Sequence, residues 1–80
     1  MNTSKLVAAG VELHPAGESA DVRIAPGTKA GDVIRQAAAR NAAFRDTEKL
    51  ELHINGRIAD LNTPVNEHDQ LYLCLPFAGN

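Results

Sequence analysis

The clearest structural signal in this 80-residue chain is Leu50-Glu-Leu-His-Ile-Asn-Gly56. Apolar residues occupy every second position of its first five, and Glu51 and His53 lie between them. Because successive side chains of a strand point to opposite faces, this alternation predicts a strand with one buried side and one solvent-facing side. Asn55-Gly56 directly after it is the strongest short signal for a hairpin turn. We therefore expect residues 57–61 to return as a short partner strand.

The N-terminal half predicts a hairpin followed by a helix. Residues 5–14 and 21–25 alternate and are separated by a loop that contains proline and glycine, which favours an antiparallel pair. Pro26-Gly27 ends the second strand, and the Thr28 hydroxyl is expected to cap the helix that follows. Residues 30–41 are good helix formers with small apolar residues on one side, so this helix can lie close on a sheet.

The C-terminal part predicts the last strand over residues 70–75. Its three leucines, including Leu75, are expected to face inward, and Tyr72 and Cys74 outward. Pro76 follows and cannot continue a strand ladder, because proline has no backbone N–H.

The order of these elements predicts an α+β fold. Five strands and one helix pack most simply as a mixed sheet of four to five strands, with the helix across one face. A chain of this length forms one domain, which we expect to span residues 1–75 and to leave residues 76–80 as a flexible tail.

Composition argues against several functions. A net charge of -2, 4% aromatic residues and no Trp give no basis for binding nucleic acid or a membrane. Cys74 is the single cysteine, which excludes an intramolecular disulfide and a multi-cysteine zinc site. His14, His53 and His68 are spread too widely along the chain to predict a metal site. No phosphate-binding glycine motif occurs, so we expect no bound cofactor and no enzymatic activity in the chain itself.

The first residues also lack the basic and apolar segments of a signal peptide. No apolar run is long enough to span a bilayer. These features predict a cytoplasmic protein.

Residues 50–60 resemble the strand–turn–strand of ubiquitin-like proteins and of the MoaD/ThiS sulfur carriers. Residues 63–73, Thr-Pro-Val-Asn-Glu-His-Asp-Gln-Leu-Tyr-Leu, resemble the carriers' run into their last strand. Residues 76–79, Pro-Phe-Ala-Gly, resemble the tail that ends in Gly-Gly in those carriers. Together with the order of elements, these segments resemble the ubiquitin-like β-grasp superfamily, which implies the β-grasp fold.

The resemblance implies chemistry at the C-terminus. In that superfamily an E1-like activating enzyme uses ATP to adenylate the terminal glycine carboxylate, and glycine suits this position because it has no Cβ. The corresponding residue here is Gly79, preceded by Pro76, Phe77 and Ala78, in a tail that could reach roughly 15–18 Å when extended. Asn80 departs from the family ending, so a processing peptidase would have to remove it before activation. An E2-like enzyme would be a further partner.

The outward face of the sheet is the expected docking surface. Ubiquitin-like proteins bind partners through central sheet positions, and the resemblance places His53, Tyr72 and Cys74 there. Cys74 and His53 could pair if their strands are neighbours. Neither an oxyanion hole nor an orienting acid is evident from the sequence, so catalysis by Cys74 is not expected.

Three functions remain open at this point. The chain is either a protein modifier trimmed after Gly79, a sulfur carrier ending in a thiocarboxylate, or an interaction module that is never conjugated. Asn80 separates the first two functions from the third, because it is either cut away or the natural end of the chain.

Overall fold

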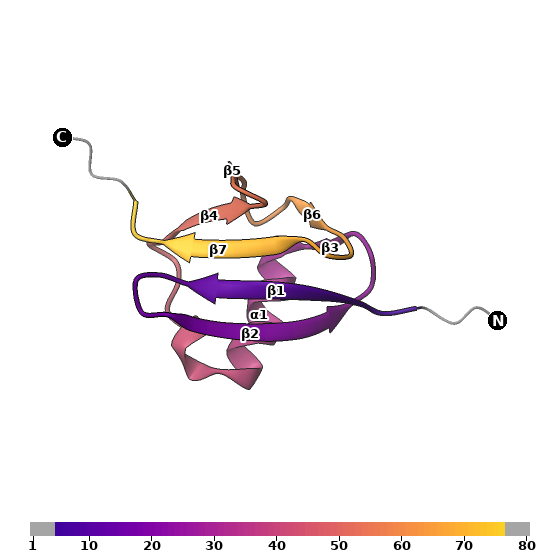
Figure 1. The fold of residues 1–80 in the computed structure, drawn as a ribbon, viewed down its shortest axis with the longest axis horizontal. Coiled ribbons are helices and arrows are strands. Elements are labelled where there is room, and N and C mark those ends of the chain that lie inside the picture. The colour runs from indigo at the N-terminus through magenta and orange to yellow at the C-terminus, as the bar shows by residue number, and fades with distance from the viewer. Residues whose placement is uncertain (1–4, 77–80) are drawn as a thin grey trace.

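Alternating apolar and polar residues form a five-stranded mixed sheet in the computed structural model, which describes residues 5–76. The strands are, in sheet order, β2 (Glu18–Ile24), β1 (Val7–Leu13), β7 (Gln70–Cys74), β4 (Glu51–Ile54) and β5 (Arg57–Ile58). The chain runs antiparallel in the β1–β2 and β4–β5 hairpins. β7 lies between them, parallel to β1 and antiparallel to β4 (Figure 1).

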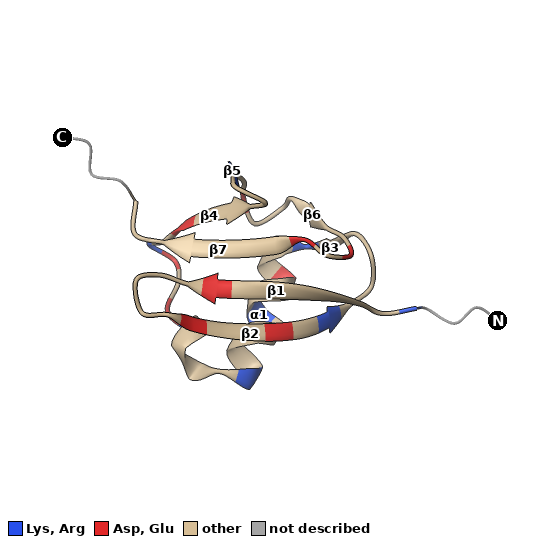
Figure 2. Ribbon diagram, in the orientation of Figure 1, with Lys and Arg blue, Asp and Glu red and all other residues tan. Residues whose placement is uncertain are grey.

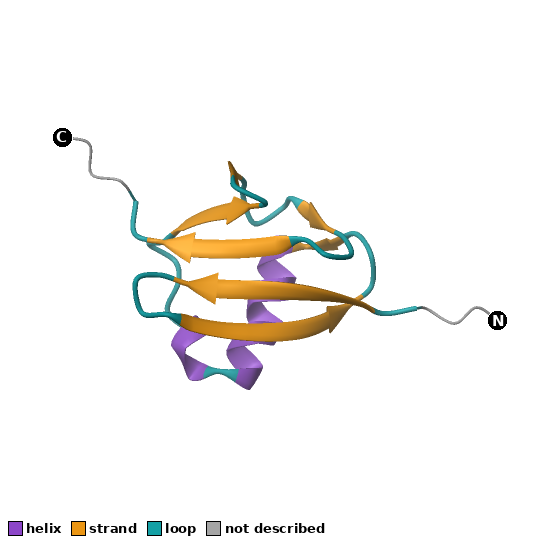
Figure 3. Ribbon diagram, viewed as in Figure 1, coloured by secondary structure: helices purple, strands orange, loops and turns teal. Residues whose placement is uncertain are grey.

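The helix covers one face of this sheet, and no helix or strand within residues 5–76 covers the other. Helix α1 (Ala30–Arg40) lies behind the sheet in the view of Figure 1, and Figure 3 shows the same separation of helix and strands. A short 3-10 helix, η1 (Ala42–Phe44), follows it and buries Phe44. The predicted α+β arrangement of one helix across one face of a mixed sheet is therefore confirmed.

The core lies between α1 and the covered face of the sheet. The helix contributes small and branched side chains, and each long strand contributes every second residue. The buried apolar residues are Ala9, Val11, Val22, Ile24, Ala30, Val33, Ile34, Ala37, Phe44, Leu52, Ile54, Val65, Leu71 and Leu73.

A second, two-stranded sheet supports the start of the helix. It pairs β3 (Thr28–Lys29) with β6 (Pro64–Val65), and neither strand was predicted. The prediction that Thr28 caps α1 is wrong, because its hydroxyl donates to the carbonyl oxygen of Ala25. Carbonyl groups of the neighbouring loop satisfy the first helical amides instead. The N–H groups of Ala30 and Gly31 donate to the carbonyl oxygens of Thr63 and Leu61, at 2.9 Å in each case.

The last strand is one residue shorter than its pattern predicts. β7 ends at Cys74, and the Leu75 side chain is 63% exposed rather than inward-facing. Pro76 explains this difference in part, because the missing N–H prevents the ladder from continuing past it.

The predicted Asn55-Gly56 turn links β4 to β5 and is also tied to β7. Asn55 has a φ of 53° and Gly56 a φ of 83°, the left-handed values that this turn requires. The Asn55 side chain donates to Asp69 Oδ1 at 2.8 Å and accepts from the Gln70 N–H at 3.0 Å. One side chain therefore fixes the turn against the beginning of the central strand.

Within the part of the chain that the structure describes, no helix has the length and apolar character needed to cross a membrane.

Leu52→Ala tests the strand register. Leu52 is buried in the core beside Leu73, so we expect this change to lower the free energy of unfolding by about 2–5 kcal/mol in a denaturant titration. A change near zero would contradict the orientation of β4.

Asn55→Ala tests the tie between the turn and β7. Loss of two side-chain hydrogen bonds, together with the poorer tolerance of alanine than asparagine for left-handed backbone, should lower the free energy of unfolding by about 1–3 kcal/mol. Asn55→Gly relieves the backbone cost and should recover part of this loss. The exposed Asn62→Ala serves as the control and should stay within about 0.5 kcal/mol of wild type.

Candidate functional site

The open face of the sheet gathers most of the polar and aromatic side chains that the sequence suggested. Because β1, β7 and β4 bury alternate residues against α1, their remaining side chains point away from the helix. This open face is defined by Glu12, His14, Glu51, His53, Ile58, Tyr72 and Cys74. Figure 2 shows acidic residues on β1, β2 and β4, on both sides of a central strand that carries no charge.

Two Glu-Leu-His segments flank the central strand. In each, the glutamate and histidine are two positions apart on one strand edge and therefore share a face. His14 Nε2 lies 3.2 Å from Glu12 Oε1, and His53 Nε2 lies 3.1 Å from Glu51 Oε1. Each carboxylate thereby fixes the orientation of its imidazole ring.

Tyr72 lies at the centre of the open face. Its ring stacks on the His14 ring with centroids 4.2 Å apart and an angle of 23° between the planes. On its other side it is directly opposite His53 in the β4–β7 pair. Tyr72 stays 39% exposed, so one side of this aromatic group is available to a partner.

Cys74 lies next to the second Glu-Leu-His segment. It is directly opposite Glu51 in the β4–β7 register, and His53 is its diagonal neighbour. The predicted grouping of His53, Tyr72 and Cys74 on one face is therefore what the fold produces. The role of Glu51 as the acid that orients His53 was not predicted, although two residues spaced by two on a strand share a face.

The surroundings of Cys74 do not favour acyl-transfer catalysis. An oxyanion hole needs backbone N–H groups aimed at the substrate. Cys74 lies at the end of β7, which pairs with β1 on one side and β4 on the other, so most nearby amides of the described strands are used in the sheet. One ground of the sequence-based prediction, the absence of an orienting acid, is wrong, because Glu51 lies 3.1 Å from His53. That Cys74 is not a catalytic nucleophile stays a prediction.

A shallow hollow opens beside these residues. It measures about 490 Å³ and is lined by His53, Asn55, Gly56, Gln70, Tyr72 and Cys74. Ile58 extends the apolar surface on the β5 side, because it is paired with His53 and is 71% exposed. The hollow and Ile58 together could accept an apolar side chain from a partner.

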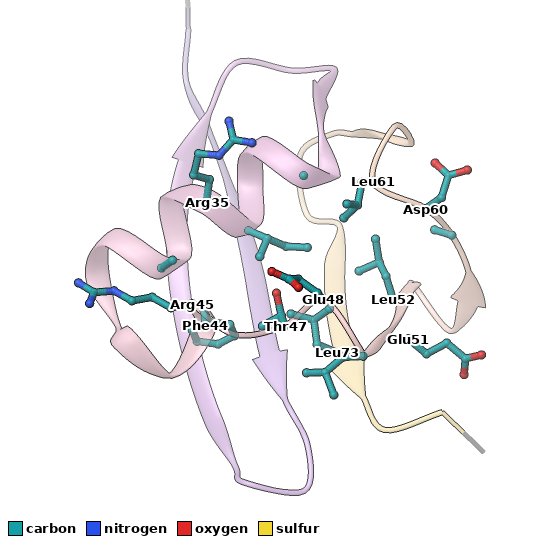
Figure 4. A pocket seen from close by; sticks show the side chains of 15 residues that line it. Arg35, Phe44, Arg45, Thr47, Glu48, Glu51, Leu52, Asp60, Leu61 and Leu73 are labelled. Atoms are coloured by element: carbon teal, nitrogen blue, oxygen red, sulfur yellow. The ribbon is translucent and has the colours of Figure 1, made fainter. Parts of the chain in front are cut away.

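A second groove lies on the helix side and was not predicted. It measures about 570 Å³ between α1 and the segment from β4 to Leu61. Figure 4 shows Leu52, Leu61 and Leu73 along it, whereas the charged ends of Arg35 and Arg45 point away. Core residues Ile34, Phe44, Leu52 and Leu73 form part of its lining, and Leu61 is 58% exposed at its rim.

The predicted tail begins where β7 ends. Leu75 and Pro76 are exposed and belong to no strand. Phe77, Ala78, Gly79 and Asn80 lie outside the described residues, so their roles stay predictions.

Solved structures of known proteins share this fold, although no match was found at the level of sequence. No family model matches the sequence, and no curated protein matches it significantly. Solved structures do match. Small archaeal modifier protein 1 of Haloferax volcanii is 15% identical, has a TM-score of 0.75, and the match covers 89% of this chain and 99% of that one.

Two further solved structures agree with it. A putative molybdopterin converting factor, subunit 1, from Pyrococcus furiosus is 14% identical with a TM-score of 0.72, and the match covers 89% of this chain and 99% of that one. A ubiquitin from Caldiarchaeum subterraneum is 18% identical with a TM-score of 0.64, over 95% of this chain and all of that one (100%). At these identities the likeness establishes architecture. The chain has the ubiquitin-like β-grasp fold, as the resemblance in its sequence predicts.

Proposed function

We propose that this chain is a ubiquitin-like protein modifier, made as a precursor and trimmed after Gly79. An E1-like enzyme would adenylate the new terminal glycine with ATP, and the activated chain would then pass to a target protein, with or without an E2-like carrier. The main support for the proposal is that the C-terminal segment leaves the sheet directly after its central strand, β7. β7 ends at Cys74, and exposed Leu75 and Pro76 follow at the edge of the open face.

The tail follows the central strand β7, which suits a segment that must enter another protein. A tail that follows the central strand starts from a rigid point, since β7 is paired on both sides. Pro76 limits the backbone freedom at the root of the tail. The few residues beyond it could then enter a narrow cleft while the domain stays outside.

The open face suits docking on the activating enzyme. It combines the stacked His14 and Tyr72 rings, the hollow and the exposed Ile58 within one surface beside the root of the tail. Partly exposed aromatic and aliphatic residues with a polar rim are typical of the centre of a protein interface.

The proposed reaction uses the chain as substrate. The Gly79 carboxylate would attack the α-phosphorus of ATP, forming an acyl–phosphate bond and releasing pyrophosphate. A thiolate or amine would then attack the acyl carbon and release AMP. The enzyme supplies the phosphate site and the nucleophile, and this chain supplies the accessible carboxylate and the docking surface.

A sulfur carrier is the second candidate. The likeness to the molybdopterin converting factor subunit favours it, because the fold match is nearly as close as that to the modifier protein. The activation step is the same, but a donor of sulfide-level sulfur would then attack the acyl carbon, form a carbon–sulfur bond and release AMP, which leaves a thiocarboxylate. An interaction module that is never conjugated is the third candidate, and an intact Asn80 would favour it.

Intact mass from native cells distinguishes the three functions. We expect a chain that ends at Gly79, together with heavier forms in which Gly79 is joined to a lysine of another protein. Replacement of one carboxyl oxygen by sulfur would identify the carrier instead. A chain that uniformly retains Asn80 without adducts would rule out both activated forms. Gly79→Ala, made in the same cells, should abolish the adducts and leave the melting temperature unchanged.

Ile58→Glu and Leu61→Glu form a matched pair that locates the docking surface. Both replace an exposed aliphatic residue by an acid, the first on the open face and the second at the rim of the groove beside α1. We expect Ile58→Glu to slow ATP-dependent activation of the trimmed chain at least about tenfold, because a charge must be desolvated in the interface. Leu61→Glu should change the rate less than about twofold, which is below 1 kcal/mol. The opposite ranking would place the docking surface on the helix side.

A further inference from the structure

Glu51, His53 and Cys74 bring three kinds of metal-binding atom together on the open face. A carboxylate oxygen, an imidazole nitrogen and the cysteine sulfur all lie within 4.8 Å of one another. The chain spacing of the histidines gave no sign of such a site. The ligands come from two strands that are about twenty positions apart in sequence and become neighbours only in the sheet.

The sheet register holds the three residues in place. Glu51 and Cys74 are direct cross-strand partners, and His53 is on the same face two positions from Glu51. The intervening Leu52 and Leu73 are buried on the opposite face and are also cross-strand partners. Ligands carried by two packed strands keep their separation better than ligands on loops.

The distances fit one small ion. Zinc binds cysteine sulfur, histidine nitrogen and carboxylate oxygen at roughly 2.0–2.3 Å, so the ligand atoms of a tetrahedral site are roughly 3.3–3.8 Å apart. His53 Nε2 and Glu51 Oε1 are 3.1 Å apart and all three ligand atoms lie within 4.8 Å, so side-chain rotations that move atoms by about 1 Å would complete the site. The ligands are also partly shielded from water, since the side chains of His53 and Glu51 are 24% and 35% exposed and Cys74 is half-buried.

The charges fit a divalent cation. The carboxylate carries one negative charge, and the thiol gives a second when its proton passes to solvent on metal binding. Neutral imidazole completes a mixed set of soft and hard donors, which zinc accepts.

We propose that Glu51, His53 and Cys74 form a zinc site with a fourth coordination position open to water or to a ligand from a partner protein. The two other Glu–His pairs in the described residues, Glu12–His14 and Glu67–His68, are not grouped with a cysteine. The proposal does not depend on conjugation, because all three ligands belong to the folded sheet.

Cobalt(II) titration of the untagged full chain tests the site. We expect one equivalent to bind per chain, with a thiolate-to-cobalt charge-transfer band in the near ultraviolet and visible absorption typical of tetrahedral cobalt. One equivalent of zinc should remove both signals. Cys74→Ser should abolish the charge-transfer band, and His53→Ala and Glu51→Gln should each weaken affinity by at least about tenfold.

His68→Ala is the matched control and should bind cobalt as wild type does, since this exposed His–Glu pair has no nearby cysteine in the described structure. Far-ultraviolet circular dichroism confirms that each variant is folded. If Cys74→Ser does not fold, His53→Ala and Glu51→Gln decide the outcome. Absence of the charge-transfer band, half an equivalent of metal per chain, or unchanged affinity in His53→Ala and Glu51→Gln would overturn the proposal.

Discussion

The pairing of β7 on both of its edges is the constraint on which the rest of the molecule depends. β1 and β2 form one hairpin and β4 and β5 another, and among the strands of residues 5–76 β7 alone connects the two hairpins within the main sheet. Its buried Leu71 and Leu73 contribute to the middle of the core. A two-stranded hairpin alone is marginally stable in water, so the final strand is what makes one sheet from two weak halves.

The same strand brings the functional surface together. Tyr72 contacts His14 from the first hairpin, whereas Cys74 is next to Glu51 and His53 from the second. The proposed docking surface and the proposed zinc site therefore overlap at one strand, just before the tail. Occupancy of the metal site would change the surface that an activating enzyme meets, and a ligand from that enzyme could fill the open coordination position.

Local patterns predicted the elements well because strands and helices repeat with fixed periods. The alternation of residues 50–54, the Asn55-Gly56 turn and the apolar side of α1 all appear where the sequence placed them. Pairing between distant segments carries no such local signal. Neither the β3–β6 pair nor the approach of Glu51 to Cys74 could be read from spacing along the chain. Leu75 was predicted to be buried because it continues the alternating pattern of β7. It is exposed instead, since the strand ends one residue earlier, at Cys74.

Backbone hydrogen bonds join the start of α1 to the segment before β7 and link the opening of the two segments. Gly27, Ala30 and Gly31 donate their amide hydrogens to carbonyl oxygens of residues 65, 63 and 61, respectively. A helix whose first turn is completed by its own side chains can fray independently, but this one relies on a segment that lies some thirty residues later in the chain. We therefore expect residues 61–65 and the beginning of α1 to open and close together, as one cooperative unit.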